Sequence, residues 1–383
     1  MSTIKKITVI GSGTMGHGIA QVSAMAGYNI SIRDVEQKFL DSAIGKIKWS
    51  LEKLLKKQKI TDLEMKAILE RIHLTTDLRE GLSDSDLVIE AVPEDLILKK
   101  KVYEGIDENA ADKTVYASNT STLPITEIAS LTSRPDRFIG LHFFNPPQLM
   151  QLVEVIPGKE TSPKVIESAV DFIDSLGKQP ILCRKDVPGF IVNRIFIPLV
   201  HEAAYCLERD KTTLVAIDMA VKEKMKFPMG IFELADYTGL DVIQKATVEM
   251  YSRDKGVINP NPIIEKLYSE GKYGQKSGQG FYEYKKEQYE RVNVANNRFE
   301  QYDPVKLVAF AANNASWLIS NGACDMKELE MALKLGMGLK GELFETVRSY
   351  GIESTVNVLR QLAQEYGSIY EPDQFLINNL RRL

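Results

Sequence analysis

The chain has 383 residues, of which 44% are hydrophobic and 26% charged, and its 48 basic and 52 acidic side chains give a net charge of −4. This length predicts two or three domains, and the balanced composition is typical of a globular protein, which excludes a disordered chain and a general attraction to nucleic acid. No stretch reaches the roughly 18 apolar residues of a membrane span, and the first apolar run is too short for a signal peptide. We therefore expect a cytoplasmic protein that binds neither a membrane nor nucleic acid.

The three cysteines have no C-x-x-C spacing, and the four histidines form no pair at helical spacing. These patterns predict no disulfide framework and no bound metal.

Residues 1–187 alternate short β-branched runs with helical stretches. The expected strands cover residues 7–11, 29–34, 86–92, 114–119, 138–144 and 152–157. Strands that alternate with helices predict a largely parallel sheet with helices on both faces, that is, an α/β Rossmann-type domain. Residues 44–72 depart from this pattern, since they read as two helices with a break near residues 59–61 and form a helical-hairpin insertion with six lysines between residues 46 and 59.

The chain becomes helical after this domain. The helical pattern of residues 188–285 predicts an all-α domain. This domain ends in a glycine-rich stretch with four glycines between residues 271 and 280. Residues 286–302 are charged and aperiodic, which is typical of a linker, and residues 303–383 predict a second all-α domain.

The two helical domains resemble each other. A shift of 112 residues places residues 218–222, DMAVK, on residues 330–334, EMALK, and the same shift pairs Gly239 with Gly351. A constant shift over such a distance indicates a duplication. Asn193 falls on Val305 at this shift, and the motif before it has no counterpart. The second copy is therefore predicted to be degenerate and without catalytic residues.

A dinucleotide-binding motif follows the first expected strand and opens a helical pattern. It consists of Gly11, Ser12, Gly13, Thr14, Met15 and Gly16. In such a turn the first glycine permits the tight bend, the second lets the backbone approach a pyrophosphate, and the third lets helix and strand pack closely. Asp34 ends the next strand, where a carboxylate can accept the ribose hydroxyls and would repel a 2′-phosphate, so we expect NAD as the cofactor.

His142 is the best candidate for the general base that removal of a hydroxyl proton requires. It lies in the expected strand 138–144, which is followed by Asn145 and two prolines and then by the strand 152–157. If these strands pair antiparallel about a centre near Gln148, His142 lies opposite Glu154. A carboxylate in that position would orient the imidazole and stabilise its protonated form.

Five motifs occur in order: GSGTMGHGIA at 11–20, SNTSTL at 118–123, GLHFFNPP at 140–147, DVPGFIVNR at 186–194 and GIFELADYTGLD at 230–241. Together they resemble the 3-hydroxyacyl-CoA dehydrogenase family over residues 4–285. The resemblance implies NAD-linked, reversible oxidation of an L-3-hydroxyacyl-CoA, as in fatty-acid β-oxidation and butyrate-type metabolism. We expect a short-chain substrate such as 3-hydroxybutyryl-CoA.

The resemblance also implies roles for individual residues. His142 would be the general acid/base and Glu154 its partner, while Ser121 and Asn193 would hold the reacting oxygen of the substrate. Glu94, Lys99, Ser121, Asn145 and Lys276 would contact the dinucleotide. Ser50 and Lys57, with Ser121, match positions that face coenzyme A, although lysines on such a helix can equally be a solvated face.

The second helical copy is expected to act as an internal partner. In shorter members of the family one helical domain forms a dimer contact, and in longer members two such domains pack on each other. We therefore expect a monomer with an internal pseudo-dimer, and hydratase or thiolase enzymes as pathway partners.

Three alternatives remain from the sequence. The chain could be an NAD-dependent dehydrogenase of a hydroxy acid without coenzyme A, similar to L-gulonate dehydrogenases. It could also be a nonenzymatic protein that retains the fold, or one component of a larger assembly with a hydratase.

Overall fold

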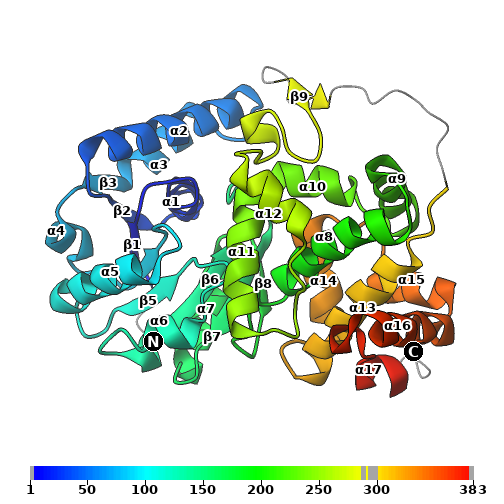
Figure 1. Cartoon of the computed structure of the whole chain (residues 1–383). Coiled ribbons are helices and arrows are strands. Elements are labelled where there is room, and N and C mark those ends of the chain that lie inside the picture. The colour runs from blue at the N-terminus through cyan, green and yellow to red at the C-terminus, as the bar shows by residue number, and fades with distance from the viewer. Residues whose placement is uncertain (1–3, 286–289, 292–300, 379–383) are drawn as a thin grey trace. The chain divides into compact units, whose positions relative to one another are not determined.

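The computed structural model describes residues 4–285, 290–291 and 301–378 (Figure 1). The chain divides into two compact units, Met1–Asp186 and Val187–Leu383. None of the helices in the described ranges is long and apolar enough to cross a membrane.

The first unit contains one eight-stranded sheet with the order β3-β2-β1-β4-β5-β6-β7-β8. The strands are β1 (Lys6–Ile10), β2 (Asn29–Arg33), β3 (Ile72–Thr75), β4 (Leu87–Glu90), β5 (Val115–Ser118), β6 (Phe138–Phe143), β7 (Leu152–Pro157) and β8 (Gln179–Leu182). Neighbouring strands are parallel except β6 and β7, which form an antiparallel pair. The α/β Rossmann-type prediction is confirmed, but β3 and β8 were not among the expected strands. Both are four-residue edge strands with polar residues or proline, so they lack the apolar run that identifies a buried strand.

Helices cover both faces of this sheet. They are α1 (Gly16–Met25), α2 (Gln37–Lys56), α3 (Asp62–Glu70), α4 (Leu78–Leu82), α5 (Leu96–Asn109), α6 (Ile125–Ala129) and α7 (Pro163–Ser175). The odd-numbered core residues of β1, β4 and β6 pack with α1, α2, α3 and α7 in one apolar cluster. The alternate residues face α5 and α6, as the ring contacts of Tyr103 with Tyr116 and Phe138 indicate. His142 and Glu154 belong to this second set of alternating positions.

The expected helical hairpin corresponds to α2 and α3. The break between them covers residues 57–61, and Gln58 has a positive φ of 53° there. Thr61 begins the second helix with a capping box, in which its side chain accepts from Glu64 N and the Glu64 carboxylate accepts from Thr61 N.

The second unit consists of two sets of helices. The first comprises α8 (Val192–Arg209), α9 (Leu214–Lys224), α10 (Ile231–Thr238), α11 (Leu240–Arg253) and α12 (Pro262–Ser269). The second comprises α13 (Val305–Ser320), α14 (Met326–Met337), α15 (Leu343–Tyr350), α16 (Ile352–Tyr366) and α17 (Gln374–Asn378). The second set follows the first helix by helix at the shift of 112 residues, and α10 and α15 coincide at both ends.

The same hydrogen bonds recur in both sets. The Asp218 carboxylate accepts from Phe232 N at 2.9 Å, and the Glu330 carboxylate at the shifted position accepts from Phe344 N at 3.0 Å. Gly239 and Gly351 join the following helix pairs with nearly the same backbone angles, φ 102° and ψ 122° against φ 85° and ψ 126°. Recurrence of the buried caps and of the left-handed glycines supports the duplication that the sequence predicts.

Most of the predicted linker, residues 286–302, lies outside the described residues. The part that is described includes the short strand β10 (Glu290–Arg291), which pairs antiparallel with β9 (Tyr284–Lys285) at the end of the preceding domain. These strands are too short to produce a visible alternation, which is why the sequence read as aperiodic.

Candidate active site

The glycine motif forms the turn between β1 and α1. Gly11 has φ +94°, and a Cβ there would lie 2.8 Å from the backbone oxygen of Ala91. A Cβ on Gly16 would lie 1.8 Å from the oxygen of Gly11, so that only glycine allows helix and turn to approach this closely. Around Gly13 nothing lies within 4 Å of a Cβ position, which leaves open space at the start of α1. The turn therefore offers backbone N–H groups and a helix N-terminus to an anionic ligand.

Asp34 follows β2 and fixes this turn. Its Oδ2 accepts hydrogen bonds from Ser12 N at 2.7 Å and from Ser12 Oγ at 2.6 Å, and its Oδ1 accepts from Val35 N at 2.7 Å. Thr14 lies exposed, and Met15 is the residue before α1. The open glycine turn, the helix N-terminus and the carboxylate at the end of β2 together fit a dinucleotide.

His142 and Glu154 lie opposite each other in the β6–β7 pair, as the predicted hairpin requires. The Nδ1 atom of His142 is 2.6 Å from Oε2 of Glu154. Glu154 has no exposed surface and His142 is 6% exposed, so the hydrogen bond is shielded from water. In the tautomer that donates Nδ1–H to this carboxylate, Nε2 is the nitrogen that can accept a proton.

Two further contacts hold the strand that carries His142. Phe143 N donates to Asn119 Oδ1 at 2.9 Å, and the ring of Phe144 lies 4.5 Å from the imidazole, centroid to centroid. Sequence reasoning missed Asn119, although it lies within the SNTSTL motif.

Ser121 and Glu94 meet at the ends of β5 and β4. Glu94 Oε1 accepts from Ser121 N at 2.7 Å, from Thr120 Oγ1 at 2.6 Å and from Ser121 Oγ at 3.3 Å. Burial raises the pKa of the Glu94 carboxyl, but the Lys99 ammonium and the hydrogen bonds from Thr120 and Ser121 outweigh it, so that the pKa lies below its usual value. Glu94 is therefore ionised at neutral pH.

Lys99 is buried, with 1% of its surface exposed. Its Nζ donates to Glu90 Oε1 and Oε2 at 2.7 and 2.9 Å and lies 3.2 Å from Glu94 Oε2. Burial lowers the pKa of Lys99, but the two carboxylates outweigh that effect and raise it above the usual value. Its contact with the dinucleotide stays a prediction. Glu90 was missed, and the signal that could have found it is a single acid within the otherwise apolar residues 87–92.

Of three further predicted residues in the first unit, two are exposed and Ser50 is half-buried. Asn145 is exposed in the hairpin between β6 and β7 and precedes a cis peptide bond to Pro146. Ser50 lies on α2, where its Oγ accepts from Gln21 Nε2 at 3.0 Å. Lys57 is exposed at the end of the same helix. Their roles stay predictions.

Asn193 and Lys276 belong to the second unit. Asn193 lies in the first turn of α8, and the Lys276 ammonium pairs with Asp241. The structure thus brings together His142 with Glu154, Ser121 with Glu94 and Ser12 with Asp34, all within the first unit. The roles of Asn193 and Lys276 stay predictions.

A Rossmann-type sheet with an open glycine turn and a shielded imidazole–carboxylate pair defines a dinucleotide-dependent oxidoreductase. Residues 6–187 match the family model for the 3-hydroxyacyl-CoA dehydrogenase NAD binding domain, and residues 189–284 match the model for the C-terminal domain. The chain therefore belongs to the 3-hydroxyacyl-CoA dehydrogenase family and is an NAD-dependent enzyme of that class.

Curated relatives match the first three quarters of the chain. The mitochondrial hydroxyacyl-coenzyme A dehydrogenase of Sus scrofa is 44% identical over 74% of this chain and 92% of its own. A probable 3-hydroxybutyryl-CoA dehydrogenase of Deinococcus radiodurans is 42% identical over 73% of this chain and 100% of its own. The crystal structure of 3-hydroxybutyryl-CoA dehydrogenase from Escherichia coli is similar over 99% of this chain and 98% of its own, with a TM-score of 0.89 and 27% identity. That similarity includes the second set of helices.

Proposed function

We propose that this enzyme interconverts short-chain L-3-hydroxyacyl-CoA and 3-ketoacyl-CoA esters, with 3-hydroxybutyryl-CoA as a representative substrate. The observation that carries the proposal is the buried pair of His142 and Glu154 at 2.6 Å. Relatives described as 3-hydroxybutyryl-CoA dehydrogenases support the short acyl chain.

Bound NAD supplies the hydride acceptor. The protein residues transfer the proton and hold the substrate oxygen. In the oxidation, Nε2 of His142 accepts the hydroxyl proton, while Nδ1–H remains bonded to Glu154, whose charge stabilises the imidazolium that forms. In the reverse direction the same nitrogen returns the proton, because one group must serve as base and acid in the two directions.

Ser121 is suited to hold the reacting oxygen. Glu94 fixes the backbone of Ser121 through a 2.7 Å hydrogen bond, whereas Ser121 Oγ lies 3.3 Å from the same carboxylate. We assign the Ser121 hydroxyl the role of donating to a substrate oxygen on the match of its motif to the family. We assign Asn193 the corresponding role from the second unit, on the match of its motif to the family.

The coenzyme A portion would lie along α2. Ser50 and Lys57 are seven residues apart, which places them on the same side of a helix. Lysine ammonium groups complement the phosphates of coenzyme A as mobile point charges.

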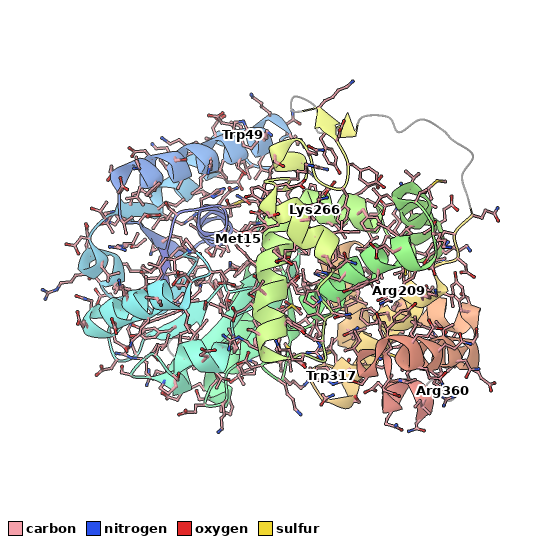
Figure 2. The ribbon with its side chains drawn as sticks, in the orientation of Figure 1. Met15, Trp49, Arg209, Lys266, Trp317 and Arg360 are labelled. Carbon is pink, nitrogen blue, oxygen red and sulfur yellow. The ribbon has the colours of Figure 1, made fainter. Side chains whose placement is uncertain are left out.

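We further propose that residues 303–383 act as an internal partner of the catalytic helices. The Cζ atom of Arg194 in α8 lies 3.7 Å from the ring centroid of Trp317 in α13. Figure 2 labels Trp317 within the second unit. Tyr370 donates to Glu202 of α8 at 2.6 Å, and Arg209 donates to both residues at 3.0 Å. This polar and aromatic interface would replace a second subunit and favour a monomer.

A chain shortened to end at Tyr302 should expose the covered face and dimerise or aggregate. A well-behaved monomer would count against the proposal.

The three cysteines are buried and form no disulfide within the described residues, which suits a reducing compartment, and we infer a cytoplasmic location. A hydratase would supply the hydroxyacyl ester, and a thiolase would consume the ketoacyl ester.

Comparing esters with free acids tests the substrate class. NADH absorbance is followed while acetoacetyl-CoA, longer 3-ketoacyl-CoA esters and free acetoacetate are offered in turn. We expect the fastest turnover with acetoacetyl-CoA and none with the free acid. Equal turnover of the free acid would show that coenzyme A is not recognised.

A further inference from the structure

A buried lysine outside the predicted site holds the hairpin segment, residues 144–151, which connects the strands of His142 and Glu154. Lys178 lies between α7 and β8 and is 8% exposed. Its Nζ donates to the backbone oxygen of Pro147 at 2.7 Å and to that of Met150 at 2.6 Å. Hydrogen bonds from an ammonium are roughly twice as strong as neutral ones, so two of them fix the segment firmly.

The backbone around Lys178 is itself well anchored. Gly177, with φ +69°, turns the chain out of α7, and Gln179 N donates to Gln151 O at 2.8 Å. Gln179 is also paired with Leu152 at the start of β7. The ammonium therefore projects from a rigid sheet edge onto the hairpin segment.

The opposite side of the hairpin segment lies against α1, the helix that follows the glycine turn. A Cβ on Gly18 would lie 2.9 Å from Gln148 Oε1 and 2.9 Å from Pro147 Cδ. Gln148 Nε2 donates to Gln21 Oε1 at 3.3 Å, and Gln21 in turn donates to Ser50. The segment is thus held between the Lys178 ammonium and the dinucleotide-binding helix.

We propose that Lys178 is a positioning residue for hydride transfer: it clamps the hairpin segment and so fixes His142 and Asn145 relative to α1. The inference rests on the proposed function, because it takes His142 as the base and the α1 turn as the cofactor site. A misplacement of reacting groups by about 1 Å can cost about 100-fold in rate, which gives such a clamp a measurable effect.

The charge of Lys178 provides a readout that a structural role would lack. Burial lowers the pKa of Lys178 to about 8. The hairpin segment and β8 have no titratable side chain, β7 has only Glu154, α1 has His17, and α7 has Lys164, Glu167, Asp171 and Asp174. Within the described part of the chain, no ion pair joins any of these acids to Lys178. A rise in pH through about 8 should therefore weaken the clamp.

The test compares Lys178→Met with Lys164→Met, an exposed lysine of α7 that serves as the matched control. For Lys178→Met we expect kcat with acetoacetyl-CoA to fall about 10- to 100-fold, with KM changed less than about threefold because α2 is untouched. The Kd for NADH, measured by fluorescence titration, should rise, and the decline of kcat above about pH 8 should disappear. The control should match the wild type.

Two results would overturn the inference. One is a Lys178→Met enzyme with wild-type kcat, NADH affinity and pH profile. The other is a loss of kcat with an unchanged pH profile and unchanged NADH affinity, which would mark a merely structural residue. If Lys178→Met fails to fold, Gly18→Ala displaces the segment from the α1 side, and unchanged kcat in that variant would overturn the inference. A wild-type enzyme inactive with acyl-CoA esters, or an active His142→Ala variant, would instead refute the proposed function.

Discussion

Replacing Glu154 by glutamine perturbs the catalytic pair with the least change of shape. The glutamine oxygen can still accept from His142 Nδ1, but the negative charge that stabilises the imidazolium is gone. Because Glu154 has no exposed surface, water cannot take over that role. The substitution should therefore slow the chemical step without disturbing the glycine turn.

The size of the effect follows from the geometry. The hydrogen bond between His142 and Glu154 is 2.6 Å long and shielded, which is at the short limit of charge-assisted hydrogen bonds. Such bonds contribute about 1.5–3 kcal/mol. Since each 1.36 kcal/mol corresponds to a tenfold change in rate, kcat should fall about 10- to 150-fold.

The assay follows NADH consumption at saturating acetoacetyl-CoA, together with NADH binding by fluorescence. Glu160→Gln, which removes an exposed charge just beyond β7, is the control and should behave as the wild type. We expect Glu154→Gln to retain NADH binding within about twofold while losing turnover to the extent given above. A Glu154→Gln enzyme with wild-type kcat would refute the role assigned to the pair.

Two further predictions concern the second unit. Burial raises the pKa of Asp218 from 3.8 to about 7, although the hydrogen bond from Phe232 N opposes this shift. The folded state therefore holds a proton that the unfolded chain releases. The free energy of unfolding should fall by roughly 4 kcal/mol as the pH rises from about 4 to 7. Asp218→Asn cannot titrate and should flatten this dependence in thermal melts between those pH values, whereas an unchanged slope would contradict the assignment. Trp317→Ala should lower the free energy of unfolding, measured in urea, by about 2 kcal/mol, because it removes the ring that packs on Arg194. Trp317→Phe should retain most of that stability. Equal stability of the alanine and phenylalanine variants would count against the stacking.

The catalytic hairpin could be predicted because its register depends on local geometry. Once two strands flank a short connection, antiparallel pairing dictates which residues face each other, and His142 meets Glu154 as expected. The duplication was also readable, because the helix-capping pairs recur at a constant spacing in the sequence.

Other features depend on tertiary packing and give weaker signals in the sequence. Lys99 belongs to a run of three lysines that resembles a solvated helix face, yet it is buried against Glu90, which lies nine residues before it on a neighbouring strand. Lys178 forms its bonds with backbone oxygens, which no side-chain pattern reveals. The edge strands β3 and β8 are defined by their partners rather than by their own composition.

The most direct test of the catalytic assignment is the rate of NADH oxidation with acetoacetyl-CoA by His142→Ala, measured beside NADH binding. Removal of a general acid/base costs typically 100- to 10,000-fold, so we expect a loss of that order with NADH affinity unchanged. A variant that turns over as fast as the wild type would contradict the account.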